Sequence, residues 1–199
     1  MKITVGSHNR KKLAEIRRIL GDLGVDVAPL PEGAPDIVED GATFAENARK
    51  KATELAAHVG GYVLSDDSGL EVEALGGRPG VHSARFGGEH GNDPKNIEKV
   101  LAMMEGQDDR RAAFRCCIVL AGPAPEGVSS DKVLITAEGS CTGTITREPR
   151  GTSGFGYDPI FIPDGYDRTF AEMPPEQKNS LSHRGKALNS FKQLLIKML

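Results

Sequence analysis

Two adjacent carboxylates, Asp66 and Asp67, are the residues best suited to chemistry in this 199-residue chain. They follow the apolar segment 62–64 after one further residue, Ser65, so we expect them at the carboxyl end of a short strand. Carboxylates in that position commonly hold a divalent metal or act as a general base. Glu39 and Asp40, on the preceding loop, could supply a second metal ligand. An Asx turn, in which an aspartate caps the following backbone, is the structural alternative.

A second candidate site is the polar segment Ser7-His8-Asn9-Arg10-Lys11-Lys12, which follows an apolar run at residues 2–6. A strand-to-helix turn directs free backbone amides outwards, and the helix dipole favours an anion there. The GxxxxGK[ST] pattern of a P-loop is absent. The segment therefore predicts phosphate binding, with an ordinary helix cap and a solvated lysine as the alternative.

The third group combines an aromatic loop with a basic segment near the C-terminus. Phe155 lies in the glycine-flanked segment Phe155-Gly156-Tyr157-Asp158. An aromatic ring in such a loop can stack on a nucleobase, a contact of about 1–3 kcal/mol. Lys178 and the segment Ser182-His183-Arg184 could donate hydrogen bonds to a carbonyl or a phosphate. The alternatives are a ring folded back into the core and ordinary polar residues before a helix.

Composition limits the class of protein. Twenty-five Lys and Arg against 28 Asp and Glu give a net charge of −3, which argues against a general nucleic-acid binder. The N-terminus turns polar after five residues, and no apolar run approaches the roughly 18 residues of a membrane span. Cys116, Cys117 and Cys141 form no CxxC pair, so we expect packing residues in a reducing compartment. These observations predict a cytoplasmic protein that binds neither nucleic acid nor membrane.

The elements that must position these residues follow from periodicity and capping signals. We expect strands at 2–6, 62–64, 112–121 and 133–142, with a Pro/Gly turn at 122–127 between the last two, which would pair antiparallel. We expect helices at about 10–23, from a capping box at 43–46 to Gly60-Gly61, at 93–105 and at the C-terminus. Residues 29–41, 76–92 and 149–165 would be loops. The order of elements predicts a mixed α/β protein.

Taken in series, these motifs resemble those of the inosine triphosphate pyrophosphatase family, whose members hydrolyse ITP, dITP and XTP. The matching segments, in chain order, are residues 7–12, 43–48, 65–70, 79–86, 155–159 and 182–188. Two positions depart from the family pattern: Ser65 replaces the usual Ala before the aspartate pair, and His82 replaces the usual Tyr. The resemblance covers nearly the whole chain.

The resemblance implies an elongated, two-lobed α/β fold, with a long curved mixed sheet, flanking helices and a central nucleotide cleft in a single domain over residues 1–199. It also implies a homodimer that requires Mg²⁺. Asp67 would be the catalytic base and a metal ligand, with Glu39 and Asp66 as further metal ligands. The implied phosphate contacts are Ser7, His8, Asn9, Arg10, Lys11, Lys12 and Lys51. The other implied substrate contacts are Ser68, Phe155, Gly156, Tyr157, Asp158, Lys178, Ser182, His183 and Arg184.

The reaction that follows is attack of water on the α-phosphorus, which releases a nucleoside monophosphate and pyrophosphate. Donors such as Arg184 would match the 6-oxo group of hypoxanthine or xanthine and would face the amino donor of adenine unfavourably. Two other functions are compatible with the same residues. One is a different metal-dependent phosphohydrolase or nuclease, and the other is a non-catalytic nucleotide-binding regulator.

Overall fold

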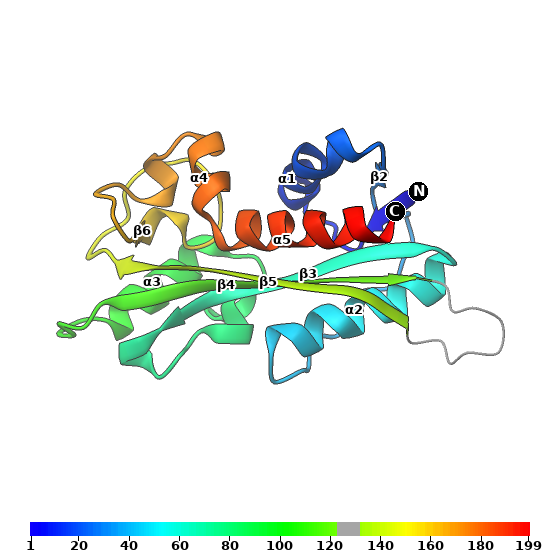
Figure 1. Cartoon of the computed structure of the whole chain (residues 1–199). Helices are drawn as coiled ribbons and strands as arrows, with labels where there is room; N and C mark the ends of the chain where they lie inside the picture. Colours follow the sequence, from blue (N-terminus) through cyan, green and yellow to red (C-terminus); the bar gives the residue numbers. More distant parts are fainter. Residues whose placement is uncertain (123–131) are drawn as a thin grey trace. The chain divides into compact units, whose positions relative to one another are not determined.

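The computed structural model describes residues 1–122 and 132–199 (Figure 1). Its helices and strands are β1 (Lys2–Val5), α1 (Arg10–Leu20), β2 (Asp26–Ala28), α2 (Phe44–Val59), β3 (Tyr62–Val72), α3 (Asp93–Met103), β4 (Arg111–Gly122), β5 (Lys132–Ile145), β6 (Phe161–Pro163), α4 (Pro175–Leu181) and α5 (His183–Met198). The turn expected at 122–127 lies, apart from Gly122, outside the described residues. None of the helices in the described ranges is long and apolar enough to cross a membrane.

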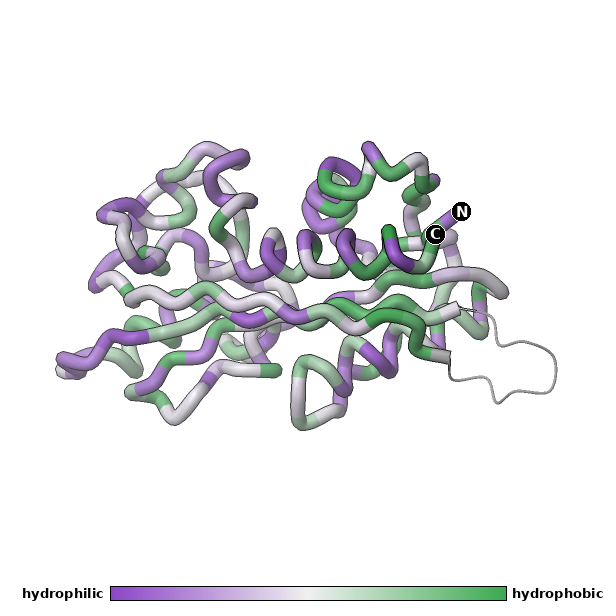
Figure 2. The backbone as a smooth tube through the Cα atoms, in the orientation of Figure 1, coloured by the Kyte–Doolittle hydropathy of each residue, from purple (hydrophilic) through white to green (hydrophobic). Residues whose placement is uncertain are grey.

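The strands form one six-stranded sheet in the order β2-β1-β3-β4-β5-β6. β1 pairs parallel with both β2 and β3, while β5 pairs antiparallel with β6. Figure 2 shows apolar residues concentrated along the strands and on the inner sides of the helices. The predicted mixed α/β class with flanking helices is therefore confirmed, although the short strands β2 and β6 were missed.

The chain divides into two compact units. Unit 1 contains residues 1–67, 116–139 and 187–199, and unit 2 contains residues 68–115 and 140–186. The strands β3, β4 and β5 each contribute residues to both units. Each unit has its own buried apolar cluster, so each is described separately below.

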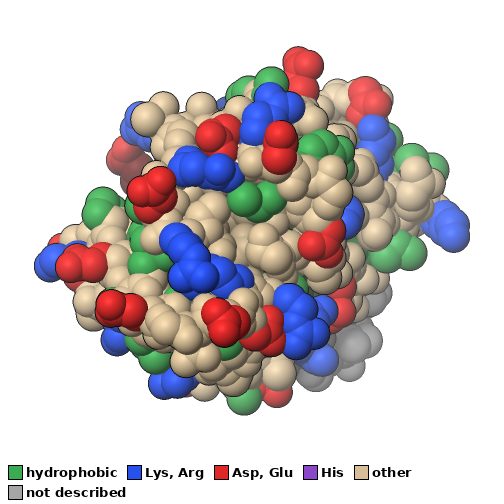
Figure 3. Space-filling view, turned by 90° about the vertical axis from the view of Figure 1, so that its left-hand side faces the viewer, with side chains coloured by type: hydrophobic (Ala, Val, Ile, Leu, Met, Phe, Trp, Pro, Cys, Tyr) green, Lys and Arg blue, Asp and Glu red, His purple; other side chains and the backbone are tan. Residues whose placement is uncertain are grey.

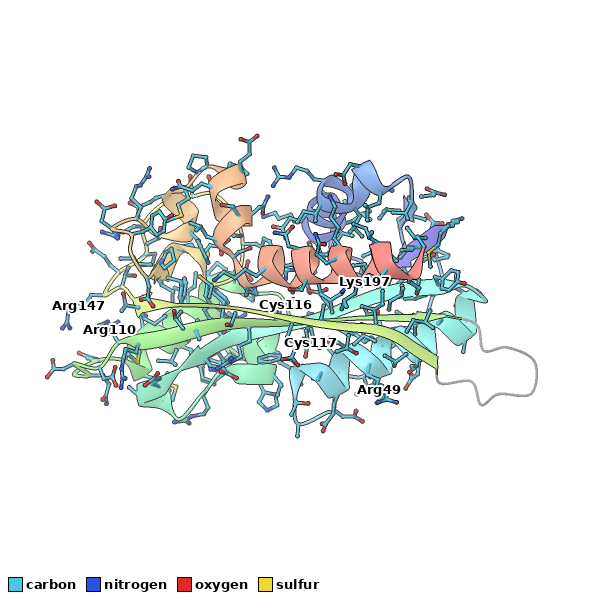
Figure 4. All side chains as sticks on the ribbon, viewed as in Figure 1. Arg49, Arg110, Cys116, Cys117, Arg147 and Lys197 are labelled. Atoms are coloured by element: carbon cyan, nitrogen blue, oxygen red, sulfur yellow. The ribbon has the colours of Figure 1, made fainter. Side chains whose placement is uncertain are left out.

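In unit 1, α1 and the end of α5 cover one face of the sheet and α2 covers the other (Figure 1). Strand alternation divides the side chains between these faces. Leu64 and Cys116 pack with α1 and α5, while Val63 and Cys117 pack with α2. Figure 4 labels the two cysteines on either side of β4. All three cysteines are buried and free, which confirms that they are packing residues.

Helix α2 begins and ends as the sequence predicts. The Thr43 hydroxyl accepts a hydrogen bond from the Glu46 amide at 3.1 Å, and the helix ends at Gly60, whose φ of +67° favours glycine. The Glu46 carboxylate reaches the amide of Ala42, one residue before the expected partner. Ala48, Ala52 and the adjoining apolar positions are fully buried, so the helix lies close against the sheet.

In unit 2, an apolar cluster packs α3 against the parts of β3, β4 and β5 that belong to this unit. Val100 and Met104 are buried together with Leu70, Phe114 and Phe161. The ring of Phe114 lies edge-on to that of Phe161, with centroids 4.7 Å apart. Helix α3 ends at Met103, two residues before the predicted end. This packing holds the C-terminal half of α3 in the apolar cluster of unit 2.

Two buried serines differ in how their hydroxyls are satisfied, and this predicts opposite effects of alanine. The Ser65 Oγ is buried and has no hydrogen-bond partner among the described residues. The Ser83 Oγ donates to the Gly80 carbonyl at 2.6 Å and accepts from the Leu70 amide at 2.9 Å. Because an unsatisfied buried polar group costs about 1–3 kcal/mol, Ser65→Ala should raise the free energy of unfolding by about 1 kcal/mol.

Ser83→Ala is the matched control, since it should lower the free energy of unfolding by about 1–3 kcal/mol by leaving two backbone groups unpaired. Urea denaturation of the two variants and of the unaltered protein measures both effects. If Ser65→Ala destabilises as much as Ser83→Ala, the Ser65 hydroxyl makes a stabilising bond and the explanation is wrong.

Candidate active site

Asp66 and Asp67 lie inside β3, not at its end. The strand continues from Tyr62 to Val72, so the predicted three-residue strand was too short. The reason is that the polar residues of this segment are buried on both faces: Asp66 is 2% exposed and Asp67 is 6% exposed. Burial normally selects apolar strand residues, so a polar segment reads as a loop.

The two carboxylates nevertheless lie close to the end of a neighbouring strand. β1 pairs with β3 only as far as Val5 and Leu64, and the Gly6 amide then donates to the Leu64 carbonyl at 2.8 Å. The two carboxylates therefore lie just beyond the carboxyl end of β1, where its chain turns towards α1. Ligands in open α/β sheets bind at this edge.

Alternation along β3 gives the two carboxylates different partners. The Asp66 carboxylate lies 3.0 Å from the Nζ of Lys12, on α1. The Oδ2 of Asp67 accepts a hydrogen bond of 3.0 Å from the side-chain amide of Asn47, on α2. Each of the two helices thus holds one carboxylate of the pair.

Asn47 is a site residue that sequence reasoning missed. Its side chain is fully buried, and its Oδ1 accepts a hydrogen bond of 2.8 Å from the Gly41 amide while its Nδ2 donates to Asp67. It therefore joins the acidic loop to the carboxylate. The available signal was a polar residue directly beside the apolar stripe of α2.

Lys51, also on α2, connects Glu39 to β3. Its Nζ donates to the Glu39 carboxylate and, at 2.7 Å, to the backbone carbonyl of Asp66. Burial alone would lower the pKa of Lys51, but the nearby carboxylates of Asp66, Glu39 and Asp67 outweigh it and raise this pKa above its usual value. Lys51 is consequently a fixed positive charge among three carboxylates.

Burial raises the pKa of the Asp67 carboxyl above its usual value. The Lys51 ammonium and the hydrogen bond from Asn47 oppose this rise, while the charges of Glu39 and Asp66 add to it. A carboxylate whose pKa is raised towards neutrality is a stronger base that still deprotonates readily. Asp67 has the environment that a general base requires.

The turn before α1 has the structure of a helix cap. The Asn9 side chain accepts hydrogen bonds from the amides of Lys11 and Lys12, at 2.9 and 3.2 Å, and the Ser7 hydroxyl accepts from the Asn9 amide at 3.2 Å. His8 is exposed, with its Nε2 3.6 Å from Asp36. Of the residues predicted to bind phosphate here, Lys12 is the one that the structure brings to the carboxylates. Arg10 and Lys11 are exposed at the helix start.

Unit 2 brings the other predicted contacts together around Phe155. The ring centroid lies 4.7 Å from the Lys178 ammonium and 5.5 Å from the Arg184 guanidinium carbon. Lys178 also forms a buried ion pair of 2.6 Å with Asp158. The Arg184 guanidinium donates to the Ser68 hydroxyl at 2.9 Å. The half-buried ring is therefore flanked by cations and is not folded into the apolar core.

The segment expected before the last helix forms its first turn instead. Helix α5 begins at His183, and the Ser182 hydroxyl accepts a hydrogen bond from the Gly185 amide at 3.1 Å. A Cβ at Gly185 would lie 1.7 Å from the Asn179 carbonyl oxygen, so only glycine fits there. The His183 ring is buried and stacked on Phe114, with centroids 4.6 Å apart.

The donor set around Asp67 fits a magnesium ion that also binds substrate. The Glu39 carboxylate contacts the Lys51 ammonium, and the charges of Glu39 and Asp67 both raise the pKa of Lys51. In nucleotide enzymes Mg²⁺ takes one or two protein carboxylates together with phosphates and water. Within residues 1–122 and 132–199, no group of three or more His, Cys, Asp or Glu side chains is arranged to hold a metal, so substrate oxygens would have to complete the coordination.

Comparison with known proteins identifies the family. The profile of the Ham1 family matches residues 3–194. The chain belongs to the Ham1 family. The dITP/XTP pyrophosphatase of Desulforamulus reducens is 47% identical over 199 residues, covering 98% of this chain and 96% of its own. The protein of the same name from Bacillus subtilis is 45% identical over 195 residues, covering 96% and 95%.

Two solved Ham1 structures match the fold over its full length. The HAM1 protein from Coxiella burnetii has a TM-score of 0.89 at 42% identity and covers 99% of both chains. The Ham1 protein from Staphylococcus aureus has a TM-score of 0.87 at 37% identity, with both chains fully covered. The family resemblance found in the sequence motifs and the α/β fold, with a mixed sheet and flanking helices, are therefore confirmed for this Ham1 chain.

The ion pair between Asp158 and Lys178 predicts a large stability effect in this Ham1 protein. Removing one partner leaves the other charge buried and uncompensated, so Asp158→Ala should lower the free energy of unfolding by about 3–5 kcal/mol. The double variant Asp158→Ala/Lys178→Met should recover part of this loss, because it leaves no buried charge. Urea denaturation measures both.

The exposed pair Asp22–Lys192, with a distance of 2.7 Å, provides the control. Asp22→Ala should leave the free energy of unfolding nearly unchanged, since solvent screens exposed pairs. An Asp158→Ala variant as stable as Asp22→Ala would show that the buried pair contributes little.

Proposed function

We propose that this Ham1 protein is a nucleoside triphosphate pyrophosphatase, which hydrolyses dITP, XTP and ITP to the monophosphate and pyrophosphate and so removes non-standard purines from the nucleotide pool. The observation that carries the proposal is the buried Asp67, whose raised pKa and fixed hydrogen bond suit a general base beside the fixed cation Lys51. Relatives named dITP/XTP pyrophosphatase match over almost the whole chain.

In the proposed reaction, Asp67 accepts a proton from the water that attacks the α-phosphorus. The hydrogen bond from Asn47 to the Oδ2 of Asp67 fixes the orientation of the carboxylate. Positioned proton transfer of this kind contributes about 10²–10⁴-fold to rate. The oxygen–phosphorus bond forms as the bond to pyrophosphate breaks.

The cations of unit 1 are suited to the charge on the departing pyrophosphate. Asp66 holds Lys12, and Glu39 and the Asp66 carbonyl hold Lys51. Charges that are already in place require no reorganisation during the reaction, and such positioning accounts for most phosphoryl-transfer catalysis. The capped N-terminus of α1, with Ser7, His8, Asn9, Arg10 and Lys11, would add amide and side-chain donors.

We further propose that Mg²⁺ is the cofactor and that Glu39 and Asp67 hold it, with Asp66 as a further predicted ligand. When bound, Mg²⁺ neutralises phosphate charge and lowers the pKa of a coordinated water. The two carboxylates lie where a cation is already favoured, because both raise the pKa of Lys51.

Unit 2 would bind the base. Phe155 would stack on the purine, while Arg184 and Lys178 offer donors that match a 6-oxo group and oppose the 6-amino group of adenine. Ser68, Gly156, Tyr157, Asp158, Ser182 and His183 would shape this part of the site. That one nucleotide contacts residues of both units, in a cleft of a single two-lobed domain, is part of the proposal.

Two expectations accompany this activity. The enzyme would work in the cytoplasm, where nucleoside triphosphates are consumed, and it would form a homodimer. The proposal involves neither nucleic acid nor membrane. Figure 3 shows one face of the molecule, on which basic and acidic side chains are interspersed and no basic stripe of the kind found in nucleic-acid binders is seen.

A substrate panel tests the proposed function. The protein is incubated with ITP, XTP, dITP, ATP or GTP in the presence of Mg²⁺, and pyrophosphate and orthophosphate are measured separately. We expect pyrophosphate from ITP, XTP and dITP, with little from ATP or GTP. Orthophosphate as the first product would indicate a different phosphohydrolase, and nucleotide binding without turnover would indicate a regulator.

The role of Asp67 is tested by Asp67→Asn. The amide oxygen of this variant can still accept the hydrogen bond from Asn47, but the amide cannot act as a base. We expect kcat to fall by about 10²–10⁴-fold, with folding and nucleotide affinity largely retained. Asp22→Asn is the control, because Asp22 is exposed, lies outside the proposed site and pairs with Lys192 at 2.7 Å; its kcat should match that of the unaltered enzyme. Near-normal turnover by Asp67→Asn would exclude it as the base.

A further inference from the structure

Three consecutive residues of the Phe155 loop are each held by a different partner. The Phe155 amide donates to Asp158 at 2.8 Å, the Gly156 amide donates to Asp93 at 2.7 Å, and the Tyr157 hydroxyl donates to the Ser83 carbonyl at 2.8 Å. All of these residues belong to unit 2. The loop is therefore held by one of its own residues, Asp158, and by two other segments of the chain, which contribute Asp93 and Ser83.

Asp93 differs from the other partners because it is the first residue of α3, 63 positions away from Gly156. The helix does not depend on Asp93 for its cap: the Asn92 side chain accepts from the Lys95 amide at 3.2 Å. The Asp93 carboxylate is instead directed at the loop. A charged acceptor makes a stronger hydrogen bond to a backbone amide than a neutral one.

Helix α3 is a firm support for this contact. Ile97 and Val100 are buried in the apolar cluster of unit 2. The buried side chain of Asn96 accepts a hydrogen bond from the Gly87 amide at 2.6 Å. Gly156 has a φ of +61°, a conformation that favours glycine. The hydrogen bond between Asp93 and Gly156 thus fixes the residue next to Phe155 relative to α3.

We propose that Asp93 is a positioning residue, which acts through the Gly156 amide to hold the Phe155 ring where it meets the purine. The inference rests on the proposed function, because it gives the ring a base to bind. Asp93 itself contacts neither phosphate nor base. The base lies far from the reacting phosphorus along the nucleotide, so stacking stabilises the bound substrate and the transition state equally. Loss of such uniform binding raises KM and leaves kcat unchanged.

The test uses Asp93→Ala and Asp93→Asn in the full-length protein. For ITP, Asp93→Ala should raise KM about tenfold, a fraction of the stacking contribution, with kcat within about twofold of the unaltered enzyme. Asp93→Asn keeps an oxygen that can accept from Gly156, so its KM should stay within about threefold. With base-free ribose 5′-triphosphate as substrate, kcat/KM should be the same for all three proteins.

Asn92→Ala is the matched control, since it removes the cap of α3 and leaves the contact to Gly156. It should lower the thermal midpoint but keep the KM for ITP. An equal rise of KM in Asn92→Ala and Asp93→Ala, or an unchanged KM in Asp93→Ala, would overturn the proposal.

A second measurement keeps the inference separate from the proposed function. Hydrogen exchange of the Gly156 amide, followed by NMR, should be at least about tenfold faster in Asp93→Ala than in Asn92→Ala. If the unaltered protein releases no pyrophosphate, the proposed function fails, while this exchange rate still shows whether Asp93 holds the loop. Equal exchange in both variants would refute the positioning role whatever the activity.

Discussion

The burial of two adjacent carboxylates in one strand is the constraint on which the rest of unit 1 depends. A buried charge is costly unless it is paired and hydrogen-bonded. Because neighbouring side chains of a strand point to opposite faces, the carboxylates of Asp66 and Asp67 take different hydrogen-bond partners. The fold therefore provides a separate helix for each: α1 brings Lys12 to Asp66, and α2 brings Asn47 to Asp67. Lys51 provides the positive charge beside the third carboxylate, that of Glu39.

Unit 2 also contains a buried carboxylate, that of Asp158, which must be paired and hydrogen-bonded. Asp158 accepts from the Phe155 amide and pairs with Lys178, so the residue that shapes the loop also fixes a cation beside the ring. A Cβ at Gly154 would lie 2.0 Å from the Asp158 carboxylate, which explains the glycine there. The aromatic ring and the cations around it are thus positioned by the same buried charge. A site built this way is organised before any ligand arrives.

Local signals predicted the elements that depend on neighbouring residues. The Thr43 cap and the stop at Gly60 each reflect contacts within a few positions of the chain. The predicted length of β3 and the predicted start of the C-terminal helix were wrong, since α5 begins at His183. In both places polar residues are buried by partners that are distant in the chain, which local polarity does not indicate. The metal and substrate roles of the candidate residues stay predictions, as does the homodimer.

The sequence by itself determined which residue types are available for phosphate chemistry, their order along the chain, and the α/β class, since all of these follow from composition, spacing and short-range periodicity. Only the tertiary structure decided which of them meet. The sequence places Asn47 beside an apolar helix stripe and Asp93 at a helix start, but neither position indicates which distant group the side chain binds. Each gains its role from an atom 20 or 63 positions away, and such pairings depend on how the helices pack against the sheet, which no local pattern encodes.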